Sequence, residues 1–115
     1  MKLIIVEPGA APQVRTVTEP LRELLGGTPS VMQFPFDRAA VIYDNSAEIR
    51  GKLPNRRYRN QWLHGTVLIV GMKDGFPCDL SPEQEVLYAQ RWNKTEVPYE
   101  KLRWPSEATL KRRLL

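Results

Sequence analysis

The richest concentration of ligand-binding side chains is a basic segment, residues 50–60, with the sequence RGKLPNRRYRN. It contains five lysine and arginine residues and no acid. Guanidinium groups are planar donors that match phosphate oxygens, and a lysine ammonium adds a compact positive charge. These residue types predict a site for a phosphate-bearing ligand.

Aromatic and amide side chains within and just after the basic segment extend this prediction. Tyrosine, tryptophan and histidine rings offer flat faces on which a nucleic-acid base can stack. Asparagine can donate to and accept from a base edge or a ribose hydroxyl. The predicted ligand-binding residues are Lys52, Asn55, Arg56, Arg57, Tyr58, Arg59, Trp62 and His64. The alternative is a plain surface loop, in which Tyr58 and Trp62 are anchored inward and the arginines are solvated.

Catalytic chemistry has fewer candidates. A nucleophilic cysteine needs a thiolate and usually a neighbouring base, and the sequence offers one of each, Cys78 and His64. An expected strand at residues 66–70 separates them, and nothing in the sequence brings them together. A zinc site needs three or four ligands, mostly cysteine and histidine. We therefore predict no enzyme, no cofactor and no metal site, and a small enzyme that uses His64 is a distant alternative.

Two expected strands hold the basic segment in place. Residues 39–43 and 66–70 are short apolar runs with several β-branched side chains, a pattern typical of buried strands. A segment between two such strands has a rigid base while its tip stays solvated. We therefore expect residues 50–60 to form an exposed binding loop.

The first third of the chain predicts a hairpin and then a short helix. Residues 2–17 hold two strand-like runs around a proline–glycine turn. Thr18 is expected to cap the helix, and a glycine pair at 26–27 to end it. The leucines expected to face the core are Leu21, Leu24 and Leu25. A third strand is expected at residues 30–34.

The clearest local signature lies at residues 81–84, SPEQ. Serine caps a helix, proline occupies its first position, and glutamine three residues later closes a capping box. We expect this helix to run to about Trp92. The side chains expected to pack it on the core are Val86, Leu87, Ala89 and Trp92. A turn at 73–75 and a short strand at Phe76 precede it.

This order of elements predicts an α+β fold in one domain, residues 1–92. A mainly antiparallel sheet is expected to carry one short and one longer helix on one of its faces. Residues 93–115 are expected to form an extension, either loosely docked or ending in a short basic helix that contains Lys111-Arg112-Arg113.

Composition is that of an ordinary soluble domain: 115 residues, 42% hydrophobic and 26% charged. No apolar run approaches the roughly 20 residues that cross a bilayer, and we see no signal-peptide pattern. The single cysteine excludes an internal disulfide and fits a reducing cytoplasm.

The net charge of +4 is distributed unevenly. Residues 1–48 hold four Lys/Arg and six Asp/Glu, which gives −2. Residues 49–115 hold thirteen Lys/Arg and seven Asp/Glu, which gives +6. A basic half of this kind indicates an acidic partner that is attracted over long range.

Five short motifs occur in an order that resembles a known family. They lie at residues 1–9 (MKLIIVEPG), 25–27 (LGG), 51–56 (GKLPNR), 64–71 (HGTVLIVG) and 80–84 (LSPEQ). The chain resembles small proteins of unknown function from phages, plasmids and conjugative elements, over roughly residues 1–92. The resemblance implies an accessory gene of a mobile element, with counter-defence as an expected role, and it brings no catalytic residues. The chain departs from the family's pattern at residues 57–59, where Arg57, Tyr58 and Arg59 replace the more neutral residues that are usual in the family.

The leading prediction is a non-enzymatic cytoplasmic protein that binds nucleic acid or a nucleotide signal through the basic segment. The alternative is a protein–protein inhibitor of a host nuclease or another defence protein. Its interface anchors would be Arg57, Tyr58 and Trp62, because these residue types are enriched in binding hot spots. No membrane partner is expected, and self-association into a homo-oligomer is left open.

Overall fold

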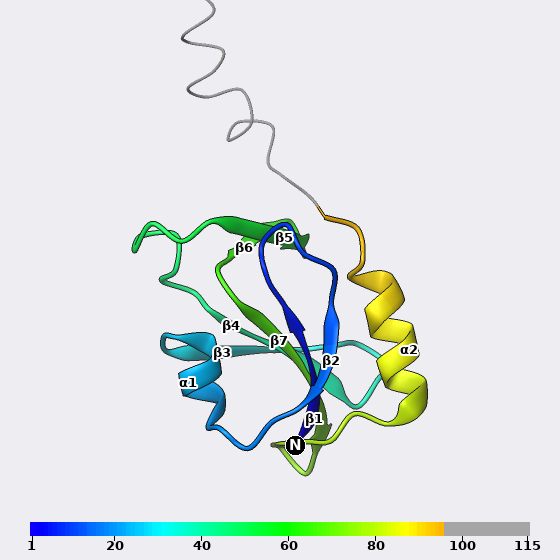
Figure 1. Ribbon diagram of the computed structural model, residues 1–115. Coiled ribbons are helices and arrows are strands. Elements are labelled where there is room, and N and C mark those ends of the chain that lie inside the picture. The colour runs from blue at the N-terminus through cyan, green and yellow to red at the C-terminus, as the bar shows by residue number, and fades with distance from the viewer. Residues whose placement is uncertain (96–115) are drawn as a thin grey trace, which may run out of the picture.

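The computed structural model describes residues 1–95, and its centre is a six-stranded antiparallel sheet (Figure 1). In spatial order its main strands are β2 (Gln13–Thr16), β1 (Lys2–Val6), β7 (Val67–Lys73), β4 (Ala39–Asp44) and β3 (Pro29–Gln33). The short β8 (Phe76–Cys78) pairs with the second half of β7. The predicted hairpin over residues 2–17 and the predicted α+β fold class are confirmed.

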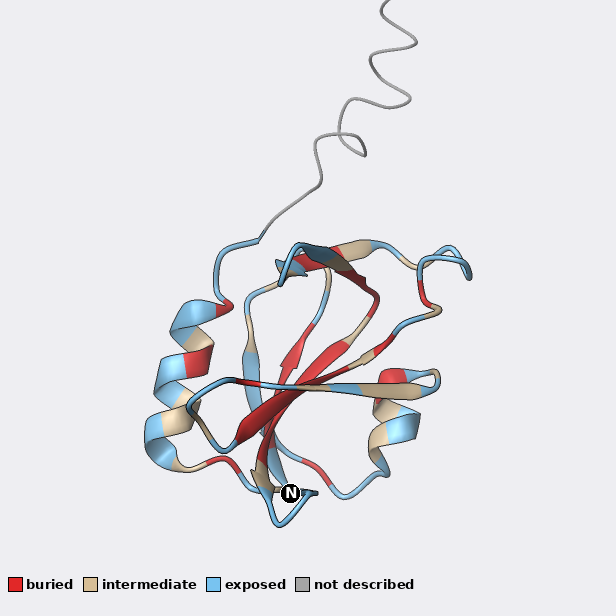
Figure 2. Cartoon of the chain, turned by 180° about the vertical axis from the view of Figure 1, so that it is seen from behind, coloured by how far each residue is buried: buried red, intermediate tan, exposed pale blue. Residues whose placement is uncertain are grey.

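The two helices cover opposite faces of this sheet (Figure 1). α1 (Leu21–Leu25) shares a core with Leu3 and Ile5 of β1, and α2 (Pro82–Arg91) shares the other core with Ile4 and Val6. Successive side chains of a strand point to opposite faces, so the central strands are buried on both sides (Figure 2). The prediction that both helices lie on one face is wrong. Continuous apolar runs are typical of strands covered on both faces.

The two helices begin differently. α2 has the predicted capping box: Ser81 Oγ accepts from Gln84 N at 3.1 Å, and Gln84 Oε1 accepts from Ser81 N at 2.9 Å. The prediction that Thr18 caps α1 is wrong, because that helix begins after Pro20 and has no side-chain cap. It ends as expected at Gly26, whose φ of 69° lies in the left-handed region that glycine tolerates.

The inward face of α2 is set by its aromatic residues. Tyr88 is 1% exposed and the capping Trp92 is 7% exposed, and they lie four residues apart on one side of the helix. Ala89 packs partly against the same core, as predicted. Val86 and Leu87 were expected there too, but they are 61% and 38% exposed. The larger aromatic side chains therefore decide which face of the helix is buried.

The basic segment forms a hairpin instead of the predicted loop. Its strands are β5 (Pro54–Tyr58) and β6 (Gln61–His64), which pair in a separate two-stranded sheet. Arg59 and Asn60 make the turn with φ angles of 50° and 62°, and positive φ at both positions suits the twist of a two-residue hairpin. Leu63 is 1% exposed in the core beneath α2. The hairpin therefore rests on the sheet near the end of α2 (Figure 1).

Asp37 fastens the turn between β3 and β4 to α2. The Tyr88 hydroxyl donates to one carboxylate oxygen of Asp37, and Gln84 Nε2 donates to the other at 3.2 Å. The hydrogen bond from Tyr88 lowers the pKa of Asp37 below its ordinary 3.8. Burial, and then the hydrogen bond to Asp37, raise the pKa of Tyr88. The contact therefore stabilises the ionised carboxylate.

We predict that Tyr88→Phe lowers the free energy of unfolding by about 1.5–3 kcal/mol at about pH 7, because a hydrogen bond to a charged group is lost. The pKa of Asp37 is lower in the folded than in the unfolded chain. The contribution of Asp37 to the free energy of unfolding is therefore fully present above about pH 3.8, its ordinary pKa. It is lost as the pH falls through the lower pKa of the folded state. Urea titrations should show that the difference between the two proteins shrinks at about pH 2. An equal difference at both pH values would contradict this account.

Candidate functional site

Arg56, a predicted ligand-binding residue, is engaged by the chain itself and is only 2% exposed. Its Nε donates to the Trp92 carbonyl at 3.0 Å, Nη2 to the Ala10 carbonyl at 2.5 Å, and Nη1 to Asn55 Oδ1 at 2.9 Å. A buried charge is tolerated when hydrogen-bond acceptors replace its water. Arg56 therefore ties the hairpin to the end of α2 and to the β1–β2 turn.

Asn55 also points inward and is 0% exposed. Its Nδ2 donates to the carbonyls of Val6 and Gly65, at 2.8 and 2.7 Å. The β5–β6 register shifts at this residue, between Pro54 and Arg56. One amide hydrogen of Asn55 therefore joins the hairpin to β1 and the other holds the link between β6 and β7, and the side chain does not face solvent.

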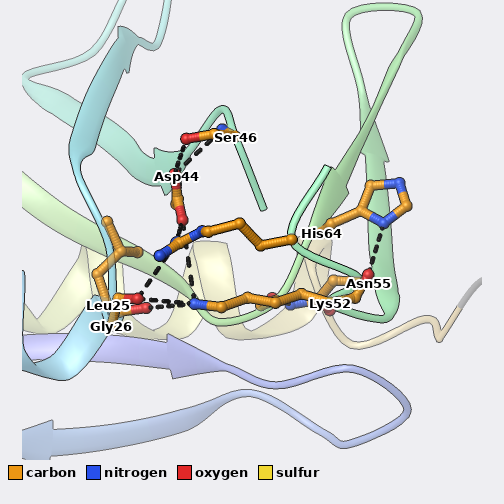
Figure 3. A network of polar contacts seen from close by, with 9 residues as sticks. Leu25, Gly26, Asp44, Ser46, Lys52, Asn55 and His64 are labelled. Carbon is orange, nitrogen blue, oxygen red and sulfur yellow. Dashed lines mark hydrogen bonds and ion pairs between the residues drawn. The ribbon is translucent and has the colours of Figure 1, made fainter. Parts of the chain in front are cut away.

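Lys52 and Arg50 form a network with the end of α1 (Figure 3). Lys52 Nζ donates to the Gly26 carbonyl at 2.9 Å and lies 3.9 Å from Asp44 Oδ2. Arg50 forms an ion pair with the same buried Asp44 and donates to the Gly26 carbonyl at 3.2 Å. Gly27 leaves the space that Asp44 and Arg50 fill, since a Cβ there would overlap both side chains. These two cations hold loops together.

His64 is 4% exposed, so its ring is not a stacking surface. Its Nδ1 lies 2.9 Å from the Lys52 carbonyl, which can only accept, so Nδ1 carries the hydrogen. Nε2 lies 3.8 Å from Glu48 Oε2. Cys78 is on β8 of the other sheet. The geometry therefore gives His64 a structural hydrogen bond.

The remaining predicted residues are presented at the surface of the hairpin. Arg57 is exposed and lies opposite the half-buried Trp62 in the β5–β6 register. The guanidinium carbon of Arg59 lies 5.4 Å from the ring centroid of Tyr58, a cation–π arrangement, and its Nη2 donates to the Gln33 carbonyl at 3.1 Å. Arg57 and Arg59 are therefore the cations of the hairpin that solvent reaches best.

Side chains from the end of α2 join the hairpin around a small cavity of about 270 Å³. We call it the basic cleft, and its lining residues are Arg56, Arg57, Tyr58, Arg91, Trp92 and Lys94. Tyr58 and Trp92 form its aromatic wall, with ring centroids 5.6 Å apart. Four of the lining residues are cations and none is an acid. Charges of one sign around a low-dielectric wall concentrate the local potential.

Sequence reasoning did not assign Arg91 and Lys94 to the site. They follow the buried stripe of a predicted helix, where cations are expected because they offset the negative end of the helix dipole. The sequence feature that could have identified them is their position on either side of Trp92. A large aromatic residue at that point is expected to face the core, and its neighbours then lie at the edge of the buried surface. The site therefore combines residues more than thirty positions apart in the sequence.

The chemistry available at the basic cleft is electrostatic binding. Within residues 1–95, no group of three or more His, Cys, Asp or Glu side chains is placed to hold a metal ion. The same part of the chain contains no helix with the length and apolarity to cross a membrane. The predicted basic tail around Lys111-Arg112-Arg113 lies outside the described residues.

We predict that Arg56→Ala lowers the free energy of unfolding by about 3 kcal/mol, because it leaves several buried acceptors without a donor. Arg57→Ala, which removes the neighbouring exposed arginine, should change it by less than about 0.5 kcal/mol. Urea titrations of the two variants and the parent protein provide the measurement. Equal effects would show that Arg56 does not hold the hairpin in place.

Comparison with known families identifies one match, a domain of unknown function (DUF3846) whose model covers residues 1–93. Neither the curated proteins nor the solved structures contain a match to the chain. The matched range takes in the sheet, both helices and the hairpin, and it ends one residue before Lys94. The chain therefore belongs to the DUF3846 family.

Proposed function

We propose that the protein binds single-stranded nucleic acid, with the basic cleft holding one nucleotide and the outer face of the hairpin holding its neighbours. The observation that carries this proposal is the convergence of cations from two elements on an aromatic wall, with no acid in the lining. Arginine and lysine bind phosphate oxygens, and the half-buried rings of Tyr58 and Trp62 can stack on bases of any sequence.

A strand fits this surface better than a single nucleotide does. The basic cleft, at about 270 Å³, is at the small end for a ligand pocket. Arg59 and Trp62 lie on the hairpin but outside the cleft lining. A ligand that contacts both the cleft and these residues must be longer than one nucleotide. The alternative ligand within the same proposal is a single signalling nucleotide, which would be bound in the cleft alone.

Trp62 is the residue we assign to base stacking. Within residues 1–95 its indole takes part in no hydrogen bond and no ring pair. It lies directly across the hairpin from Arg57, so a ring and a guanidinium group are adjacent on one face. That pairing places a stacking surface beside a guanidinium group that can donate hydrogen bonds to a phosphate.

The proposed biological role is sequestration without catalysis, in the cytoplasm of a host cell. The resemblance to small proteins of phages, plasmids and conjugative elements supports a counter-defence task, in which the protein covers a nucleic acid that a host nuclease would cut. The burial of His64 and its hydrogen bond to the Lys52 carbonyl support a role without general-base chemistry.

A protein–protein inhibitor of a host nuclease or another defence protein is the second candidate. The exposed pair Arg57 and Trp62 favours it, since both residue types are common in hot spots. Tyr58 was expected as a third anchor, but its ring packs 5.5 Å from Phe34 and 5.6 Å from Trp92, centroid to centroid. An interface of this kind would rest on two side chains.

We predict that binding of a fluorescent single-stranded oligonucleotide weakens steeply with salt. The slope of log affinity against log salt is about −0.7 per phosphate neutralised, so the four exposed cations Arg57, Arg59, Arg91 and Lys94 give a slope near −3. The double variant Arg57→Ala, Lys94→Ala should reduce the magnitude of this slope by about 1.4, because two phosphate contacts are lost. Fluorescence anisotropy at several salt concentrations measures the slope.

The matched control is the double variant Arg15→Ala, Arg22→Ala, which removes the same charge from exposed positions on β2 and α1. It should keep the parent slope. Equal slopes for the two double variants would reject the basic cleft as the site. A mononucleotide that alone raises the melting temperature would favour the nucleotide signal, and absence of binding to both ligands would favour the inhibitor.

We predict that Trp62→Ala weakens oligonucleotide binding by roughly fivefold to 150-fold, because one stacked base contributes about 1–3 kcal/mol. The control variant is Phe76→Ala, which removes an exposed aromatic ring from β8 and should have no effect. An abasic oligonucleotide of the same length should bind the parent protein and Trp62→Ala equally. If the abasic strand also loses affinity in the variant, Trp62 does not stack on a base.

A further inference from the structure

Phe36 is the most exposed apolar residue in the described part of the chain. It lies in the turn between β3 and β4, and its relative exposure is 107%, so no other residue within positions 1–95 covers the ring. Its φ is 64°, in the left-handed region that few bulky residues adopt. A residue that is both strained and fully exposed gains nothing from the fold of its own chain. Such positions are concentrated at functional surfaces.

The turn that carries Phe36 is held rigidly. Asp37 accepts from Tyr88, and Arg38 N donates to Asp37 Oδ1 at 2.7 Å. Gln84 Nε2 donates to the Arg38 carbonyl at 3.2 Å. These bonds fix both the turn and its angle to α2. Because the backbone of the turn is already fixed, burial of Phe36 by a partner orders the ring and little of the backbone.

An open groove of about 930 Å³ lies beside Phe36. Its lining is polar and apolar in about equal parts; of its apolar members Met72 is half-buried, whereas Phe34 and Leu80 belong to the buried core. A second groove, of about 630 Å³, lies on the α2 side and also includes Phe36 in its lining. Phe36 therefore stands between two concave surfaces, and one face of the molecule carries both a projecting ring and an open groove of mixed polar and apolar lining beside it.

We propose that two copies of this chain pair through this face, with Phe36 of each copy inserted in the larger groove of the other. A two-fold interface uses the same surface on both copies, so it requires a projecting group and its receptor side by side. The groove also carries both signs of charge, Arg38 and Lys73 with Asp37 and Asp79. In a two-fold arrangement the cations of one copy can face the acids of the other.

This pairing goes beyond nucleic-acid binding and leaves the basic cleft open. The larger groove and the basic cleft have no lining residue in common. A dimer would therefore present two basic clefts at a fixed separation. When both clefts of one dimer bind the same nucleic-acid strand, the effective affinity increases without any new kind of contact.

Sedimentation velocity of the full chain, up to about 0.1 mM, tests the pairing. The parent protein should sediment as a dimer, and Phe36→Asn should sediment as a monomer. Asparagine tolerates the left-handed region, so the monomeric variant should remain folded, as its circular dichroism spectrum would show. Ile49→Asn, which changes another exposed apolar residue, should remain a dimer.

A photo-cross-linking phenylalanine analogue at position 36 provides the second measurement. In a mixture of isotopically light and heavy chains, it should form cross-links between chains at Met72 or Leu80. A parent protein that stays monomeric at about 0.1 mM would overturn the proposal. So would a Phe36→Asn variant that remains dimeric, or inter-chain cross-links that map away from the groove.

Discussion

The buried guanidinium group of Arg56 is the interaction on which the arrangement of the site depends. A charge removed from water is costly unless acceptors replace its hydration. Here the acceptors come from Ala10 in the β1–β2 turn, Asn55 in β5 and Trp92 at the end of α2. One side chain therefore fixes three segments that are distant in sequence. The basic cleft forms where these segments meet. Two of its lining residues are placed there by Arg56: Arg57 follows Arg56 directly in the sequence, and the Trp92 carbonyl accepts a hydrogen bond from Arg56.

The five cations of the basic segment consequently divide into two roles. Arg50, Lys52 and Arg56 donate to carbonyl oxygens of the chain and hold loops together. Arg57 and Arg59 are exposed on the hairpin. Side chains of a strand alternate between faces, so Arg56 lies inward and Arg57 outward in β5. Charge density along the sequence cannot separate these roles, since structural and ligand-binding arginines share one composition.

Elements specified by local chemistry were predictable from the sequence. The capping box at Ser81, the hairpin over residues 2–17 and the apolar strands β4 and β7 all follow from neighbouring residues. The β5–β6 hairpin was missed because its turn, Arg59-Asn60, lacks the glycine that usually marks positive φ. The contribution of Arg91 and Lys94 was missed for a different reason. It depends on how α2 packs against the hairpin, which is a long-range property of the fold.

Two of the positive-φ residues show how this fold departs from what stability alone would select. Glycine or asparagine would occupy the positions of Phe36 and Arg59 with less strain. Arg59 has a contact that offsets part of this cost, since it lies over Tyr58 and donates to the Gln33 carbonyl at the end of β3. Phe36, three residues after Gln33, has no comparable contact with the described residues, because its ring is fully exposed. The turn that presents Phe36 and the hairpin that presents the exposed cations are therefore joined through the end of one strand. The remaining strain is concentrated at Phe36, whose ring no other residue of the described part of the chain covers.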